Sequence, residues 1–313
     1  MSNTSPKTSL TGSDRPPPGA PTLCLGDPVV AFVGETPVGS VSDVDAFVPH
    51  FGGSAATVAI TACRHGAHVS LVGGAGDDAW GRWLRDRLER EGVLTDWFEL
   101  VAGARTPVAI VAVDRAGDPS GALYGERGIG SALAERLEDA IRASAALSIC
   151  IGGPEGSDVT ISARDLAVSL GRPFMFAPRL CLEGWRSRAE AAAVANACVP
   201  GALLVCASLG DAAVMTGEEA PERAALALLK AGARMVVITL GVREGAILRG
   251  ELRLDVDDVP ASGISSIGAA DALAGVLLAR LAMSAFYPAA VAASLPEAVA
   301  EAARACERWG ALD

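Results

Sequence analysis

The amino-acid sequence predicts an α/β fold built on a doubly wound, mostly parallel sheet with a small β-rich lid. Short apolar runs of strand length alternate with helix-length stretches along most of the 313 residues, which is the pattern of βαβ units. Half of the residues are hydrophobic and a fifth are charged, so the chain can bury a core. Residues 1–20 are mostly Ser, Thr, Pro and Gly and predict a disordered tail, which leaves 21–313 as a single domain.

The individual elements follow from the local pattern. Short apolar runs predict strands at 22–25, 29–33, 69–73, 108–113, 147–151, 173–176, 202–207, 235–239 and 246–248. Helix periodicity predicts helices at 54–65, 79–91, 131–143, 162–170, 185–197, 211–215, 221–231, 269–283 and 296–308. Two segments, about 34–49 and 104–127, are rich in Gly, Val and polar residues and poor in helix formers. We expect them to form the lid, where it would cover an active site.

Composition excludes several classes of protein. The net charge is −11, from 26 basic and 37 acidic residues, which argues against nucleic-acid binding. No window of about 20 residues is free of charges and helix breakers, so we expect no transmembrane helix. The seven cysteines form no C-x-x-C pair and the three histidines are scattered, so neither a disulfide framework nor a metal site is expected. The N-terminus has no secretory pattern, and we expect a cytoplasmic protein.

The turn at 263–271 is the most informative candidate site, because ligands of such sheets bind where a strand leads into a helix. The stretch that it opens, 271–282, is apolar all round apart from Arg280 and predicts a buried helix. Free amides at the start of such a helix can bind an anion. Asp271 beside them suits a general base that takes a proton from a hydroxyl attacking a phosphate. The alternative is a carboxylate that only complements the helix dipole.

A second candidate is the end of the β-branched run at Thr239, followed by Gly241 and Gly245. These glycines suit a loop that approaches a nucleotide closely, or simply a tight turn between two strands. The segment 71–79 contains G-x-G-x-x-A, a dinucleotide-binding pattern. We regard that interpretation as the weaker one, because two aspartates at the helix start would repel a pyrophosphate.

A third candidate is the pair Gly52 and Gly53 at the start of the helix predicted at 54–65. This turn could fold over a sugar hydroxyl, with Thr57 as a hydrogen-bond donor. An ordinary helix start would have the same residues and would need no ligand.

Taken in order, these motifs resemble the PfkB (ribokinase-like) family of carbohydrate and nucleoside kinases, from about Leu23 to Ala311. The motifs are Gly52-Gly53, V-G-G-x-G-x-D-x-x-G at Val72–Gly81, E-G-V at Glu91–Val93, T-P-V-A at Thr106–Ala109, T-L-G-x-x-E-G-A at Thr239–Ala246 and G-A-x-D at Gly268–Asp271. The resemblance implies a ribokinase-like fold, in which the β-rich lid covers the sugar site and often forms a homodimer.

The activity that the resemblance implies is phosphoryl transfer from ATP, with Mg²⁺ assisting, to a hydroxyl of a sugar, a sugar acid or a nucleoside. It makes Asp271 the general base and gives the anion hole to the amides of Gly268, Ala269 and Ala270. The residues that it assigns to nucleotide binding are Thr239, Gly241 and Gly245, and we add Ser208 and Asp211 of the altered magnesium-linked motif. It assigns Gly52 and Gly53 to substrate binding, and we add Thr57 and Arg179, which stand at altered positions. None of these residues is expected to be a protein ligand of a resident metal.

Five positions depart from the family pattern, and the ordinary family sugars should therefore bind poorly. The substitutes are Ala31 for an aspartate that grips sugar hydroxyls, Thr57 for an asparagine, Ala177-Pro178-Arg179 for D-P-N, Ser208 to Asp211 for the magnesium-linked N-x-x-E, and Ala270 for a glycine. Three functions stay open. The first is a kinase with an unusual substrate, and Arg179 could pair with an acidic group of that substrate. The second is a catalytically silent protein that binds a nucleotide or sugar as a sensor or partner subunit, and the third is an enzyme of altered chemistry on the same fold.

Overall fold

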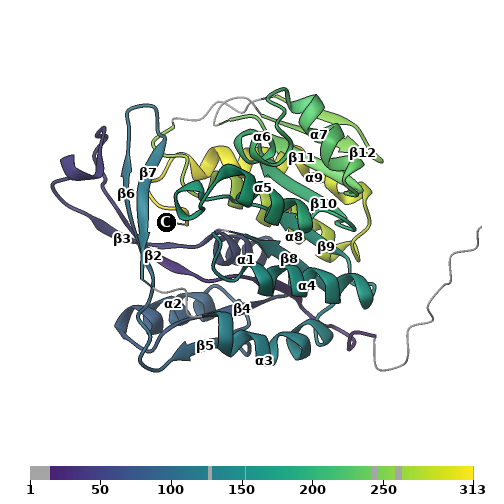
Figure 1. Cartoon of the computed structure of the whole chain (residues 1–313), viewed down its shortest axis with the longest axis horizontal. Coiled ribbons are helices and arrows are strands. Elements are labelled where there is room, and N and C mark those ends of the chain that lie inside the picture. The colour runs from purple at the N-terminus through teal and green to yellow at the C-terminus, as the bar shows by residue number, and fades with distance from the viewer. Residues whose placement is uncertain (1–14, 126–128, 152, 242–244, 258–262, 313) are drawn as a thin grey trace, which may run out of the picture.

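The computed structural model describes residues 15–125, 129–151, 153–241, 245–257 and 263–312. The predicted tail at 1–20 therefore lies mostly outside the described residues. The rest of the chain folds into a large sheet between two helical layers, with a second, smaller sheet at one end (Figure 1). The predicted α/β class is confirmed.

The large sheet has nine strands in the described part of the chain, in the order β13-β12-β11-β10-β9-β8-β1-β4-β5. All neighbours are parallel except at one edge, where β12 runs antiparallel to both β11 and β13. The strands are β1 (Thr22–Leu25), β4 (Val69–Gly76), β5 (Phe98–Val101), β8 (Ala146–Cys150), β9 (Phe174–Ala177), β10 (Leu204–Ser208), β11 (Met235–Thr239), β12 (Ala246–Gly250) and β13 (Leu254–Val256). The inner strands are buried along their length because helices cover both faces.

One helical layer consists of α1 (Ser54–Arg64), α2 (Ala79–Arg90), α8 (Ala269–Met283) and α9 (Ala289–Ala305). The other consists of α3 (Ile129–Arg142), α4 (Ser157–Ser169), α5 (Arg188–Ala197), α6 (Leu209–Thr216) and α7 (Pro221–Lys230). Each layer closes a separate hydrophobic core on its side of the sheet. Helix α8 is buried along almost its entire length, as its all-round apolar sequence predicts.

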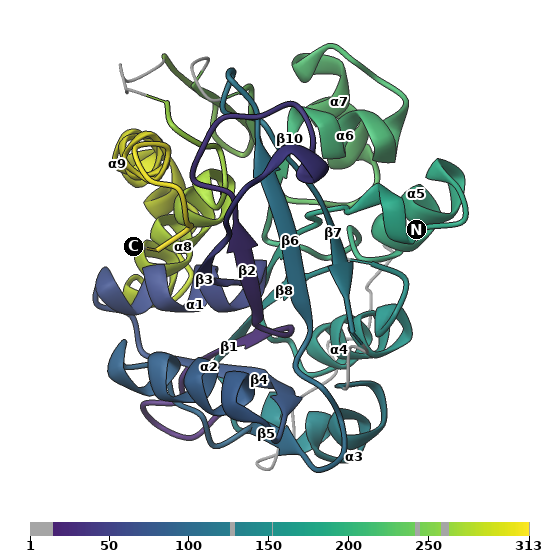
Figure 2. The same ribbon diagram turned by 90° about the vertical axis from the view of Figure 1, so that its left-hand side faces the viewer.

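The small sheet has the strand order β3-β2-β6-β7 and stands across the end of the large sheet (Figure 2). Its strands are β2 (Val29–Val33), β3 (Val48–Gly52), β6 (Val108–Val113) and β7 (Pro119–Tyr124). The segment 104–127, as far as it is described, supplies β6 and β7, whereas only the last two residues of 34–49 lie in a strand. The sheet is anchored to the main body on one side by Phe32, whose ring meets Trp80 edge-on at 5.5 Å between centroids.

Four strands were not predicted individually, namely β3, β5, β7 and β13, although β7 lies within the segment 104–127 predicted for the β-rich lid. Strand β7 reads Pro-Ser-Gly-Ala-Leu-Tyr and is half-exposed, so it has neither an apolar run nor a β-branched residue. Strand β13 has three residues and is held by its pairing with β12. Such strands form because a partner edge is available, which local patterns do not reveal.

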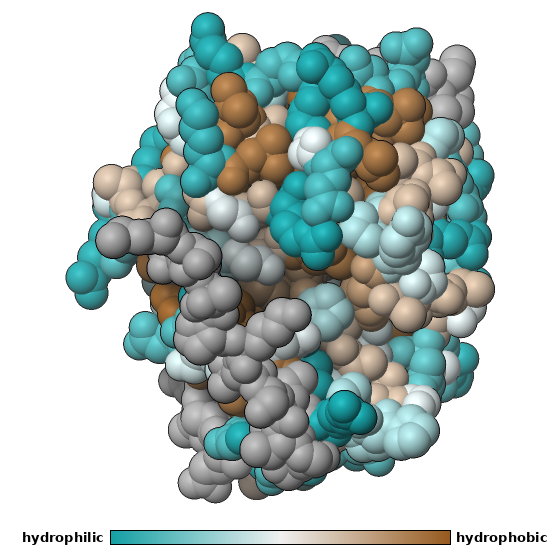
Figure 3. Space-filling model, turned by 90° about the vertical axis from the view of Figure 1, so that its right-hand side faces the viewer, coloured by the Kyte–Doolittle hydropathy of each residue, from teal (hydrophilic) through white to brown (hydrophobic). Residues whose placement is uncertain are grey.

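The side of the molecule turned away from the small sheet mixes hydrophilic and hydrophobic residues over the part that is described (Figure 3). Within the described ranges, no helix combines the length and the apolar character that crossing a membrane would require. The expected cytoplasmic location and the homodimer through the small sheet stay predictions.

Candidate active site

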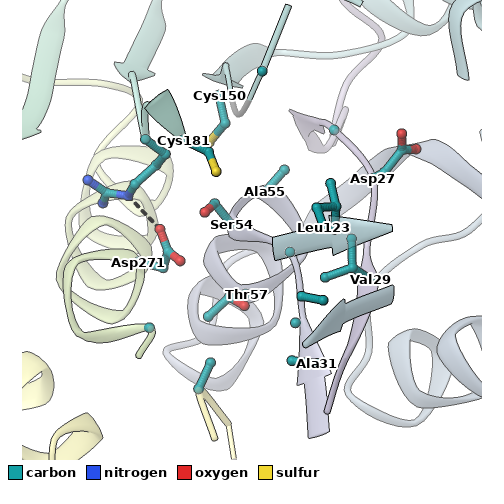
Figure 4. Close-up of a pocket in the computed structure, with 18 of the residues that line it drawn as sticks. Asp27, Val29, Ala31, Ser54, Ala55, Thr57, Leu123, Cys150, Cys181 and Asp271 are labelled. Carbon is teal, nitrogen blue, oxygen red and sulfur yellow. Dashed lines mark hydrogen bonds and ion pairs between the residues drawn. The ribbon is translucent and has the colours of Figure 1, made fainter. Parts of the chain in front are cut away.

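A pocket of about 680 Å³ lies between the small sheet and the helix N-termini of the main body. One wall is formed by β2, β6 and β7. The opposite side is formed by the starts of α1 and α8 and by the segments that follow β1, β8 and β9. The predicted site residues Gly52, Gly53, Thr57 and Arg179 line it together with Gly268, Ala270 and Asp271. Figure 4 shows Thr57 and Asp271 on neighbouring helices, facing the strand that carries Ala31.

The start of α8 forms the polar end of the pocket. Gly268 is the N-cap, with a left-handed backbone (φ 78°). A Cβ atom there would lie 2.4 Å from the Cβ of Ala311, so both the conformation and the space require glycine. Ala270, which stands where the family has a glycine, lies in regular helix without a positive φ. The alanine is therefore compatible with this backbone.

The amides at this helix start are only partly used by the protein. The N–H of Ala269 donates to the carbonyl of Ser266 at 3.2 Å, and the N–H of Ala272 donates to Gly268 at 2.8 Å. Among the described residues, none accepts a hydrogen bond from the N–H of Gly268 or of Ala270. Two of the three amides predicted for an anion hole are thus available to a ligand.

Asp271 forms a buried ion pair with Arg179, a contact that the sequence did not predict. The Arg179 Nε donates to the Asp271 Oδ1 at 2.5 Å, and its Nη2 donates to the Ala270 carbonyl at 2.5 Å. The dashed line that ends on Asp271 in Figure 4 marks this pair. The side chains are only 10% and 12% exposed. Arg179 adopts φ 51°, a left-handed backbone that costs a non-glycine residue about 1–2 kcal/mol.

The electrostatics around this pair keep the nearby thiols protonated. Burial alone would lower the pKa of Arg179, but Asp271, Cys206 and Asp211 outweigh it and raise that pKa. Burial, with Asp271 adding to it, raises the pKa of Cys150 to about 12. Burial likewise raises the pKa of Cys206, although Arg179 opposes the shift. Cys150 and Cys206 are therefore neutral small side chains here and not nucleophiles.

The Gly52-Gly53 turn brings β3 and α1 to the pocket and holds the backbone close to the loop between β1 and β2. Gly53 has φ 98°, and a Cβ there would lie 2.5 Å from the carbonyl oxygen of Asp27. Thr57 lies one turn into α1 and is almost fully buried. The glycine is thus explained by packing alone, while Thr57 contributes a hydroxyl-bearing side chain to the pocket.

The residues predicted for the nucleotide lie outside this pocket, on neighbouring strands of the large sheet. Ser208 ends β10 and is paired with Thr239 at the end of β11. The Ser208 hydroxyl caps α6 by accepting from the N–H of Asp211 at 3.0 Å, and Asp211 Oδ1 accepts from the N–H of Leu180 at 3.1 Å. Both side chains therefore have structural partners already.

The two glycines of the same motif lie in the turn between β11 and β12. Gly245 has φ 73°, and a Cβ there would lie 2.0 Å from a backbone oxygen of β13. The N–H of Leu240 donates to the Gly245 carbonyl at 3.0 Å, which closes the turn. Gly241 begins it, and residues 242–244 lie outside the described residues. This geometry accounts for Gly245 as a turn residue and leaves nucleotide contact as a prediction.

The motif at 72–81 has a structural role. Its aspartate, Asp78, caps α2 by accepting from the N–H of Gly81 at 2.8 Å. The same carboxylate accepts from the N–H of Thr106 at 2.9 Å and from its hydroxyl at 2.7 Å. It thereby joins two motifs that are 28 residues apart in the chain. A helix start occupied by its own aspartate offers no site for a pyrophosphate, which disfavours the dinucleotide interpretation.

Sequence reasoning missed Asp27, an acidic residue that also lines the pocket. Its Oδ1 accepts from the N–H of Gly74 at 3.0 Å, which ties the end of β1 to β4. Asp27 follows the first parallel strand by two residues. The rule that ligands gather beyond the carboxyl ends of parallel strands would have included it.

Fold and pocket together define an α/β protein of the ribokinase-like class. A family model described as pfkB family carbohydrate kinase matches residues 22–311. The chain therefore belongs to the pfkB family of carbohydrate kinases, phosphotransferases that act on an alcohol group.

Curated relatives and solved structures agree with this family. Probable fructokinase-4 of Arabidopsis thaliana is 26% identical over 265 residues, which are 83% of this chain and 81% of the relative. Fructokinase-1 of Oryza sativa subsp. japonica is 28% identical over 83% of this chain and 82% of its own. The fructokinase of Vibrio cholerae O395, solved with fructose, ADP and calcium ion bound, has a TM-score of 0.79 at 23% identity and covers 94% of each chain. A putative ribokinase II of E. coli in complex with ATP and Mg²⁺ has a TM-score of 0.81 at 19% identity and also covers 94% of each.

Proposed function

We propose that this protein transfers a phosphoryl group from ATP to a hydroxyl of a sugar, sugar acid or nucleoside bound in the pocket. Asp271 acts as the general base, and Mg²⁺ assists. The observation that carries the proposal is the place of Asp271 in the first turn of a buried helix, on the pocket and beside the unpartnered amides of Gly268 and Ala270. A hydroxyl between this carboxylate and a phosphate on the amides would have both groups that the reaction needs.

The ion pair with Arg179 is compatible with this role. Only Oδ1 of Asp271 accepts from the guanidinium, and no described residue donates a hydrogen bond to Oδ2. Phosphoryl transfer passes through a loose transition state, so the base has to orient the hydroxyl more than to remove its proton early. Arg179 fixes the carboxylate for that purpose, and its charge lies close to the place where the phosphate charge has to be stabilised.

The donor set is compatible with a magnesium-nucleotide complex. Among the described residues, no three acidic, His or Cys side chains gather into a metal site. Mg²⁺ does not need one, because it keeps several waters and is commonly bound through one or two carboxylates and the substrate phosphates. Asp211, held at Oδ1 by the N–H of Leu180, would be such a carboxylate. A bound Mg²⁺ would neutralise phosphate charge. The complexes of the structural relatives with ADP or ATP and a divalent cation support this choice.

The test measures ADP release with ATP, Mg²⁺ and a panel of sugars, sugar acids and nucleosides, in the wild type and in Asp271→Asn. We expect kcat to fall by about 10²–10⁴-fold in the variant, since general acid–base catalysis contributes that much. Asp158→Asn is the matched control, because Asp158 also lies in the first turn of a helix but is exposed and outside the pocket. Full activity of Asp271→Asn would exclude Asp271 as the base. Ligand binding without turnover in the wild type would favour the catalytically silent alternative.

A further inference from the structure

The small sheet presents a carbon surface to the pocket. Alternate residues of a strand lie on one face, and the register places Ala31 opposite Ala109, which in turn lies opposite Leu123. The next row places Val33 opposite Val111, and Val111 opposite Gly121. All of these residues except Val33 line the pocket, and so does Val29. None of their side chains can form a hydrogen bond. Figure 4 shows Val29, Ala31 and Leu123 on this wall.

The main chain of the two inner strands of this wall does not compensate for the missing side-chain groups. Strands β2 and β6 are the inner strands of the small sheet, and each pairs with a neighbour on both sides. Their N–H and C=O groups are therefore used within the sheet. Ser120, on the edge strand β7, is the polar side chain that the described part of this sheet adds to the pocket lining.

The hydrogen-bonding groups of the pocket are concentrated on the opposite side. Ser54 and Thr57 come from α1, Asp271 comes from α8, and Asp27 lies at the end of β1. Arg179 is the basic residue among the described ones that line the pocket, and it is already paired with Asp271. A ligand is therefore offered polar partners on one side and carbon on the other.

This asymmetry selects the acceptor. A monosaccharide has hydroxyls all around its ring, so those that face the small sheet would lose their water without gaining a partner. Each such hydroxyl lowers affinity by about tenfold or more. A ring that turns carbon toward the sheet gains from the same contact, because burying apolar surface is favourable. An acceptor hydroxyl on the other side of the ring would reach Asp271.

We propose that the acceptor is a ring alcohol, an aromatic or aliphatic ring with one hydroxymethyl group and few other polar substituents, rather than a free monosaccharide. The ring packs on the wall formed by Val29, Ala31, Ala109, Val111 and Leu123. The hydroxymethyl group lies near Asp271 and Thr57. This assignment rests on the proposed function for phosphoryl transfer in this pocket, and it replaces the sugar, sugar acid or nucleoside given there by a less polar ring alcohol.

The experiment compares the binding of ring alcohols and sugars to the full chain by saturation-transfer NMR. The probes are benzyl alcohol, 3-pyridinemethanol and cyclohexanemethanol against D-fructose and D-ribose. In the wild type we expect dissociation constants about tenfold or more lower for the ring alcohols than for the sugars. Ala31→Asp, which puts a hydrogen-bonding group into the wall, should weaken the ring alcohols about tenfold and strengthen D-fructose.

Two further variants keep this test decisive. Val48→Asp places the same charge on β3 of the small sheet, at an exposed residue outside the pocket lining, and should leave both constants unchanged. Ala31→Ser is the smaller substitution to use if Ala31→Asp does not fold. It should weaken the binding of the ring alcohols and strengthen that of D-fructose, each by a smaller factor than Ala31→Asp.

The outcomes separate this inference from the kinase proposal. Equal or tighter binding of D-fructose by the wild type, no detectable binding of any ring alcohol, or equal effects of Ala31→Asp and Val48→Asp would each overturn the acceptor assignment. ADP release with a sugar, sugar acid or nucleoside but with no ring alcohol would overturn the acceptor assignment and leave the kinase proposal standing. Tight binding of ring alcohols without ADP release from any acceptor would contradict the kinase proposal and show that the wall binds ring alcohols without their being phosphorylated.

Discussion

The two sides of the pocket differ in almost every chemical respect. The side formed by the helix starts and by the segments that follow β1, β8 and β9 contains carboxylates, a guanidinium, hydroxyls and free amides, packed so closely that Gly268 has no room for a side chain. The side formed by the small sheet contains aliphatic side chains and, among its described residues, one polar side chain, that of Ser120. The first is suited to a phosphate and a reacting hydroxyl, and the second to the rest of the acceptor.

The difference indicates that the two halves of the site have different constraints. Asp271 and Gly268 match the family pattern in residue type and position, whereas Ala31 on the small sheet does not. Ala177-Pro178-Arg179 is also altered, but its arginine now contacts Asp271. Ala270 and the segment Ser208 to Asp211 also depart from the family pattern, at positions predicted for the phosphate and the nucleotide. Alanine fits the helix backbone at 270, and Ser208 and Asp211 still have hydrogen-bonding side chains.

The largest expected effect comes from separating the Arg179–Asp271 pair. Arg179→Met leaves a carboxylate buried without its partner, which should lower the free energy of unfolding by about 3 kcal/mol. In the double variant Arg179→Met/Asp271→Asn no unpaired charge remains, so we expect much of this loss to be recovered. Urea unfolding of the wild type, both single variants and the double variant gives the coupling free energy directly. Strictly additive effects would show that the pair is not coupled.

The side of the pocket formed by the helix starts could be predicted from the sequence, because local sequence patterns indicate where those helices begin. Helix α8 begins at residue 269, as expected, since a glycine N-cap followed by an apolar run is visible in the chain itself. The order of the motifs also indicated which helix starts would meet at the pocket. The role of Asp78 was not visible, because its partner Thr106 is 28 residues away and the contact depends on how α2 packs.

The ion pair and the carbon wall could not be predicted in the same way. Arg179 and Asp271 are 92 residues apart, and Arg179 reaches Asp271 from a left-handed backbone that local sequence does not favour. The wall combines single residues of three strands, one of which, β7, has no strand-like pattern. Only the register of the small sheet brings Ala31, Ala109 and Leu123 into one row.

The second largest effect concerns Gly268, and it tests whether the close packing at the start of α8 requires a glycine there. Gly268→Ala should destabilise the protein by about 2–3 kcal/mol, through the left-handed backbone and the contact with Ala311. Gly156→Ala is a matched control, since Gly156 is also a left-handed N-cap (φ 77°) but has no atom within 4 Å of the added Cβ. It should cost only about 1 kcal/mol. Thermal unfolding measures both, and equal losses would show that the contact with Ala311 relaxes without cost.

The smallest effect concerns the link between the two sides, where Asp78 of the main body holds Thr106 just before β6. Asp78→Asn replaces one acceptor oxygen by an amide group that cannot accept from these donors, and should cost about 1–2 kcal/mol at pH 7. Although partial burial opposes the shift, hydrogen bonds from Thr106 and Gly81 lower the pKa of Asp78.

The low pKa of Asp78 gives this prediction a pH dependence with a definite sign. A carboxyl whose pKa is lower in the folded state stabilises the protein above its unfolded pKa of about 4, and that stabilisation is lost as the pH falls through the folded value. The difference in unfolding free energy between wild type and Asp78→Asn should therefore shrink in acid. Asp77→Asn is the neighbouring control, because Asp77 pairs with Arg82 at the surface and should change stability by less than about 0.5 kcal/mol. If urea unfolding gave a difference for Asp78→Asn that stayed constant from neutral pH to about pH 3, the carboxylate would not be what joins the two sides of the pocket.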